Sequence, residues 1–86
     1  MKSASITVGT TATLLIAADD THRTCYMHVI GNSTVYLGNS TVTTTTGLAT
    51  EKHTAPIEIV VPSRQTLYAI VETATEDVRI LTPDID

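Results

Sequence analysis

Three residues with metal-binding side chains, His22, Cys25 and His28, follow one another at a spacing of three. Imidazole nitrogen and thiolate sulfur are the ligands that zinc binds most often in proteins. If residues 24–30 are extended, however, Cys25 and His28 point to opposite faces of a strand. In the same geometry His22 lies about 20 Å from His28, so the three side chains cannot surround one ion. We therefore expect no metal and no cofactor, and we interpret Cys25 as a small buried apolar residue.

The other side chains that could do chemistry are dispersed. His53 lies in a polar stretch, where we interpret it as an isolated surface histidine. The acidic residues Asp19–Asp20, Glu72 and Glu76–Asp77 lie in or beside predicted turns, where a carboxylate is normally solvated. The sequence has no G-x-S-x-G motif for a nucleophilic serine, and its four glycines are isolated rather than grouped into a phosphate-binding loop. We expect no enzymatic activity.

The charge pattern argues against nucleic-acid binding. The chain has nine acidic and five basic residues, which gives a formal net charge of −4. A nucleic-acid partner requires a basic stripe that neutralises phosphates. The basic residues are instead scattered along the sequence: Lys2, Arg23, Lys52, Arg64 and Arg79. We expect no nucleic-acid partner.

Two Asn-Ser-Thr triplets, at residues 32–34 and 39–41, match the acceptor motif for N-glycosylation. We interpret both as turns that lead into strands, because asparagine is favoured in turns and threonine in strands. The longest apolar run near the N-terminus, residues 14–18, is too short for a signal-peptide core or a membrane span. We expect a soluble, unprocessed protein with no membrane contact.

Alternation of apolar and polar residues, bounded by turn residues, predicts an all-β fold. Threonine, valine and isoleucine are abundant, and β-branched side chains favour strands over helices. Strands are predicted at residues 5–8, 12–17, 24–30, 34–37, 57–61, 67–72 and 78–81. This spacing indicates one small antiparallel β-sandwich or barrel of about seven to eight short strands. The single domain spans residues 1–86 with short N- and C-terminal arms, and we expect residues 42–55 to form a long loop or an irregular edge segment.

Alternation also gives each strand an inward apolar face. Its members are Ile6, Val8, Cys25, Met27, Val29, Ile57, Ile59, Val61, Leu67, Ala69 and Val71. The opposite parity is more apolar than the surface of a small monomer normally is. Its apolar members are Leu15, Tyr26, Ile30, Tyr36, Val60, Tyr68, Ile70 and Leu81. Three explanations are open: the sheet closes into a barrel, the strand register is misassigned, or these side chains form a subunit interface.

The small size of the core favours the interface. The chain has 86 residues, no Trp and no Phe, and scaffolds of this size usually need disulfides, metals or partner subunits. With one cysteine, an intramolecular disulfide is impossible. We expect a homo-oligomer, with a trimer favoured, whose interface includes Tyr36, Tyr68, Ile70 and Leu81.

Five short motifs resemble those of small structural proteins of tailed-bacteriophage virions. They are Val8-Gly9-Thr10 before residues 12–17, Val35-Tyr36-Leu37-Gly38, Val42-Thr43 with Gly47-Leu48, Leu67-Tyr68-Ala69-Ile70, and Val78-Arg79-Ile80-Leu81. That group includes capsid decoration (cement) proteins, head-fibre bases and tail accessories. The sequence departs from its pattern between Thr50 and Ala55, where Glu51-Lys52-His53 stands in place of a Gly-containing turn.

The resemblance implies a capsid decoration protein, made in the bacterial host cytoplasm and bound to the major capsid protein on the outer surface of the virion. The expected capsid contacts are the two terminal arms, namely Met1, Lys2 and Ser3 at one end and Pro83, Asp84 and Ile85 at the other. Short polar arms are free to order against a neighbour, and a symmetric oligomer presents each arm several times. The alternative is a virion-displayed adhesin or carbohydrate-binding module, or a head-fibre or tail accessory protein.

Overall fold

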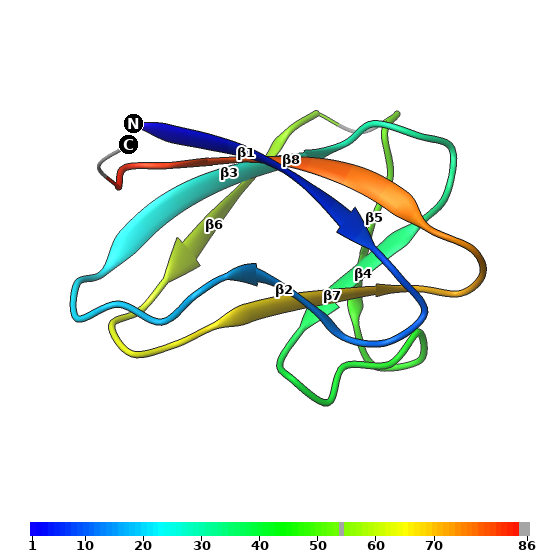
Figure 1. Ribbon diagram of the computed structural model, residues 1–86, viewed down its shortest axis with the longest axis horizontal. Helices are drawn as coiled ribbons and strands as arrows, with labels where there is room; N and C mark the ends of the chain where they lie inside the picture. The colour runs from blue at the N-terminus through cyan, green and yellow to red at the C-terminus, as the bar shows by residue number, and fades with distance from the viewer. Residues whose placement is uncertain (54, 85–86) are drawn as a thin grey trace.

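The protein is a sandwich of two four-stranded antiparallel sheets, seen in a computed structural model that describes residues 1–53 and 55–84 (Figure 1). This confirms the all-β sandwich predicted from the alternation. The strands are β1 (Lys2–Val8), β2 (Thr13–Ile16), β3 (Arg23–Val29), β4 (Val35–Gly38), β5 (Leu48–Thr50), β6 (Ile57–Val61), β7 (Leu67–Val71) and β8 (Glu76–Thr82). Among the described residues there is no helix that could cross a membrane.

The strand order is β1-β8-β3-β6 in the first sheet and β2-β7-β4-β5 in the second. Every paired strand runs antiparallel to its neighbour. The strand that alternation missed is β5, which has three residues and pairs with β4 at the edge of the second sheet. Within residues 42–55, the expectation of an edge segment is therefore confirmed at Leu48–Thr50, while the residues before it form turns.

The core lies between the two sheets and is aliphatic. Its most buried side chains are Val8, Val29, Val35, Val71, Val78 and Cys25. They alternate along their strands with more exposed residues, so the predicted inward faces are confirmed. Cys25 is completely buried, as its interpretation as a core residue required.

One predicted facing was wrong, at Leu15. The pairing of β2 with β7 shifts register between Leu14 and Ile16. A bulge of this kind places two residues of one strand opposite one residue of the other and redirects the side chains. Leu15, which alternation had placed on the outward parity, is therefore buried beside Ile16, and Leu14 is 42% exposed instead.

A compact turn follows β4 and closes the second sheet. Asn39 Oδ1 accepts hydrogen bonds from the backbone N–H of Thr41 (3.0 Å) and from its hydroxyl (2.9 Å). Val42 folds back under this turn and is 5% exposed. A Cβ at Gly38 would lie 2.7 Å from Val42 Cγ2, so only glycine fits beneath the turn. These hydrogen bonds confirm the interpretation of residues 39–41 as a turn, but the expectation that this turn leads directly into a strand was wrong, because further turns follow up to β5.

Candidate functional site

The three candidate metal ligands do not form a cluster. Cys25 is buried in the core, His28 lies on the outer side of β3, and His22 is exposed just before β3 begins. His53 is exposed in a turn. The described residues contain no group of three or more His, Cys, Asp or Glu side chains that could hold an ion. That the chain binds no metal and no cofactor stays a prediction.

The environment of Cys25 does not suit nucleophilic chemistry. Burial raises the pKa of the Cys25 thiol, and the nearby Arg23 guanidinium opposes this only in part. The thiolate is the reactive form of cysteine, so the environment of Cys25 disfavours the reactive species.

Three of the four predicted interface residues lie together on the outer face of the second sheet. Tyr36 of β4 is directly opposite Ile70 of β7, and Tyr68 lies two residues from Ile70 on the same side of β7. Leu14 joins them, because it pairs with Tyr68 from β2. We call Leu14, Tyr36, Tyr68 and Ile70 the sheet-two face.

The fourth residue, Leu81, is on the other side of the molecule. It lies on the outer face of the first sheet, opposite Tyr26 of β3, and it is 38% exposed. The four predicted interface residues therefore do not share one surface, and the place of Leu81 in a subunit interface stays a prediction. Alternation assigns a residue to a face of its own strand, but it does not say which of the two sheets that strand joins.

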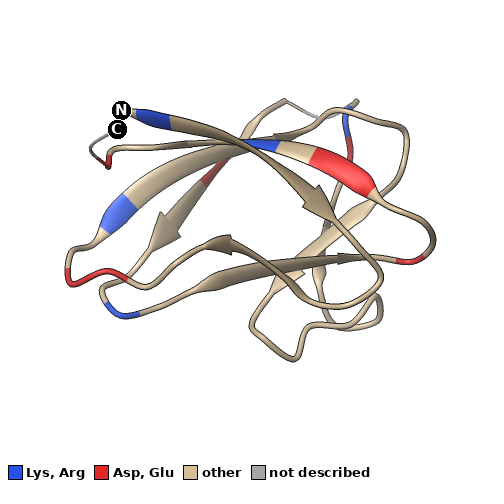
Figure 2. Ribbon diagram, viewed as in Figure 1, with Lys and Arg blue, Asp and Glu red and all other residues tan. Residues whose placement is uncertain are grey.

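Charge separates the two outer faces. The strands of the second sheet contain no charged residue, whereas the outer face of the first sheet carries Glu58, Asp77 and Arg79. The other charged residues on the strands of the first sheet have inward parity, namely Lys2 and the buried Arg23 and Glu76. Figure 2 shows the same division. The sheet-two face is therefore both apolar and uncharged, as the centre of a protein interface usually is.

The expected N-terminal arm is not an arm. Lys2 and Ser3 belong to β1 and lie opposite Thr82 and Leu81 of β8. This part of the sequence reading was wrong, because serines and alanine give too weak an apolar signal to reveal a strand. Met1 precedes the strand and is exposed.

At the other terminus, Pro83 is exposed just beyond β8, and Asp84 Oδ2 lies 3.4 Å from the Arg23 guanidinium. Ile85 lies outside the described residues. The first and last described strands run side by side, so Met1 and Pro83 lie at the same end of the molecule (Figure 1).

Arg23 is a buried cation, which the sequence analysis listed only among the scattered basic residues. It is 5% exposed, and its Nη2 donates to the carbonyl oxygen of Ala17 at 2.7 Å. Its Nε and the hydroxyl of Thr82 are buried and have no hydrogen-bond partner among the described residues. Both residues line a groove that opens between β1 and β2. Parity alone could have placed Arg23 inside, because it alternates with Cys25.

Glu76 is a second buried charge with a structural role. It begins β8 and is 8% exposed, which corrects its interpretation as a solvated turn residue. Its carboxylate accepts hydrogen bonds from the backbone N–H of Ser33 (2.8 Å) and of Asp77 (3.0 Å). Glu76 therefore fixes the loop between β3 and β4. Here too parity was informative, because Glu76 shares the face of Val78.

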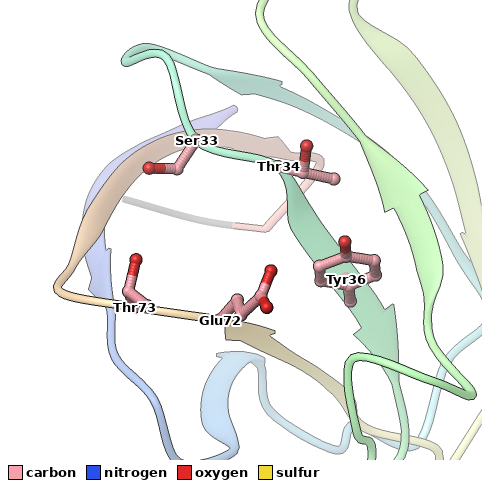
Figure 3. A pocket seen from close by; sticks show the side chains of 5 residues that line it. All are labelled: Ser33, Thr34, Tyr36, Glu72 and Thr73. Atoms are coloured by element: carbon pink, nitrogen blue, oxygen red, sulfur yellow. The ribbon is translucent and has the colours of Figure 1, made fainter.

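A small polar pocket lies where the start of β4 approaches the end of β7. Figure 3 shows its five side chains around one hollow: Ser33, Thr34, Tyr36, Glu72 and Thr73. It combines one phenol ring, one carboxylate and three aliphatic hydroxyls. The lining offers hydrogen-bond donors and acceptors beside an aromatic ring, which suits the binding of a polar ligand; that the chain has no enzymatic activity stays a prediction.

Comparisons with known proteins do not assign the chain to a family. No family model matches it, and neither a curated protein nor a solved structure gives a match.

Proposed function

We propose that this chain is a structural protein of a bacteriophage virion, and most specifically a capsid decoration protein that binds the outer capsid surface and stabilises the shell. The observation that carries the proposal is the sheet-two face: an apolar, uncharged surface on a domain with a small core. Such a surface is a candidate for contact with protein.

The sheet-two face supports assembly, and the motifs that resemble virion proteins support the location. The proposed self-contact uses Tyr36, Tyr68 and Ile70, with a trimer as the expected state. The proposed capsid contact uses Met1, Lys2 and Ser3 together with Pro83, Asp84 and Ile85. The first five of these lie at one end of the molecule, so they could meet the major capsid protein at the same time.

A binding experiment tests this proposal. Purified full-length protein is titrated onto capsids that lack it, and the number of bound copies and the capsid melting temperature are measured. We expect saturable binding and a higher melting temperature, because a ligand of the assembled shell stabilises it by mass action. Replacing Lys2 with alanine should weaken binding, whereas replacing Lys52, which is exposed in a distant turn, should not. Absence of binding by the unmodified chain would refute the decoration role.

A second candidate function, carbohydrate binding by a virion-displayed adhesin, is favoured by the pocket of Tyr36 and Glu72. Sugars are typically held by a ring stacked against an aromatic side chain and by hydrogen bonds from carboxylates and hydroxyls. Titration with bacterial surface polysaccharides tests it. The adhesin hypothesis requires that binding is lost in Glu72→Ala and kept in Glu58→Ala, because Glu58 lies on the first sheet.

A further inference from the structure

The four sheet edges differ in how well they are protected against pairing with another chain. An unprotected edge strand presents a row of unpaired backbone N–H and C=O groups, and proteins block such edges with short strands, bulges, prolines or charges. In the second sheet, β2 has four residues and a bulge, and β5 has three residues. In the first sheet, β6 lies between Pro56 and Pro62 and carries Glu58.

The remaining edge, β1, has none of these protections. It is seven residues long, and all seven pair with β8 without a register shift. It contains no proline, and its one charge, Lys2, is at its first residue. It pairs with β8 on one side, and on its other side no strand of the sheet follows.

The surface beside β1 is a groove with both apolar and charged side chains. Its apolar lining includes Ala4, Ile6, Leu14, Ile16 and Ile80, and its charged lining is Lys2, Asp19, Arg23 and Asp84. Ala4 and Ile6 point inward but are only half-buried, because no strand lies next to them on the open side. An additional strand at this edge would cover both side chains and close the groove.

We infer that β1 pairs with β1 of a second copy of this chain, antiparallel and centred on Ser5. This contact joins the two first sheets into one continuous sheet of eight strands. Ser5 is the middle residue of Lys2–Val8, so a two-fold axis through it pairs all seven residues. With the two-fold axis through Ser5, odd-numbered residues lie opposite odd-numbered ones and even-numbered residues opposite even-numbered ones. The inward side chains of both copies, which are the even-numbered ones, therefore lie on the same side of the joined sheet.

The side chains of β1 suit this register. Ala4 of one copy lies opposite Ile6 of the other, which is an apolar pair on the inward side. Ser3 lies opposite Thr7, and Ser5 opposite itself, and hydroxyl pairs of this kind are favourable across strands. Lys2 lies opposite Val8, so no like charges meet. Self-complementarity of the same surface is what a two-fold contact requires, and it identifies a second copy rather than an unrelated peptide as the occupant.

The edge contact is made by β1, whereas the proposed self-contact through the sheet-two face uses Tyr36, Tyr68 and Ile70; Leu14 borders both. A two-fold contact doubles the assembly that the sheet-two face forms, so a trimer made through that face becomes a hexamer and the complete assembly contains an even number of chains. If the unmodified chain forms the edge contact but does not bind capsids, only the decoration role is contradicted. If it binds capsids but does not form the edge contact, only the present inference is contradicted.

Glutamate substitutions at two positions of β1 test the inference and its register. In its own chain Ser5 lies opposite Arg79, so Ser5→Glu gains a cation beside it and leaves the single domain folded. Across the two-fold axis, the two introduced carboxylates face each other, and like charges directly opposite are destabilising. We expect the mass at micromolar concentration to fall by half and the dissociation constant to rise about tenfold or more.

Ser3→Glu is the matched control, because the same change at an equally exposed position of β1 places the carboxylate opposite Thr7. It should leave the mass unchanged. Circular dichroism is used to check that both variants fold, and light scattering is used to measure their masses. An odd number of chains in the unmodified protein, or a mass that Ser5→Glu does not lower, would overturn the inference. Equal loss of mass in both variants would overturn the register centred on Ser5.

Discussion

Glu76 and Gly31 form a close contact that holds the loop between β3 and β4. The Glu76 carboxylate accepts the backbone N–H groups of Ser33 and Asp77, and a Cβ at Gly31 would overlap with that carboxylate. A buried carboxylate is stable only when its oxygens are hydrogen-bonded. The loop and the charge therefore depend on each other.

We predict that Glu76→Ala lowers the free energy of unfolding by about 1–3 kcal/mol, because two backbone donors lose their acceptor. Glu72→Ala, at an exposed carboxylate, should change it by less than about 0.5 kcal/mol. Denaturant unfolding measures both. The double variant Glu76→Ala with Gly31→Ala should cost less than the sum of the single changes, because the overlap at Gly31 disappears with the carboxylate; strict additivity would contradict the contact.

The burial of Cys25 makes the stability of the fold depend on pH. Because burial raises its pKa, the folded chain holds the thiol proton more tightly than the unfolded chain does. The contribution of the thiol to stability is therefore complete below its ordinary pKa of 9.0 and decreases as the pH rises above it. We predict a steeper loss of stability above this pH for the unmodified chain than for Cys25→Ala, measured by denaturant unfolding. Parallel curves would show that Cys25 does not contribute.

At the scale of elements, the sequence predicted seven of the eight strands, because they alternate clearly between turn residues. It missed β5, whose three residues are too few for alternation to be read, and the start of β1, whose Ser3 and Ala4 are weakly apolar. The bulge in β2 reversed the facing of Leu15. The sheet to which each strand belongs depends on contacts between distant segments, which placed Leu81 away from the sheet-two face.

The assignment of residues 2–4 to β1 predicts that they stabilise the fold. Their removal deletes one end of the β1–β8 ladder and exposes part of the core beneath Ala4. We expect a lower melting temperature, corresponding to about 1–3 kcal/mol. The combination of Lys2→Ser with Ser3→Ala keeps the backbone ladder and serves as the control in thermal unfolding. An unchanged melting temperature after the deletion would instead indicate a free arm.

At the scale of the whole molecule, charge is divided unequally between the two sheets, because the strands of the second sheet carry no charged residue and those of the first do (Figure 2). Exposed apolar side chains occur on both sheets, at Leu14 on the second and at Tyr26, Val60 and Leu81 on the first. A net charge of −4 repels copies of this chain only weakly. The strands of the second sheet add no charge that would oppose self-association. This division is the reason why we propose the sheet-two face, rather than the charged outer side of the first sheet, for contact through a sheet face.

This division predicts different effects for two equal substitutions. Ile70→Glu places a charge in the sheet-two face and should dissociate the contact made there, because an unpaired charge in an apolar interface is costly. Val60→Glu places the same charge on the outer side of the first sheet, where Val60 is 50% exposed, and should leave the assembly intact. Light scattering distinguishes the variants, and an equal effect of both would argue against the sheet-two face.

The central claim is that this domain associates with further copies of itself. Its most direct test is to measure the mass and the melting temperature of the unmodified chain together over a dilution series. Association adds to stability by mass action, so the melting temperature of an oligomer depends on its concentration. We predict a mass of several chains at micromolar concentration and a melting temperature that falls on dilution. A stable monomer of 9.2 kDa whose melting temperature does not change with dilution would contradict this account.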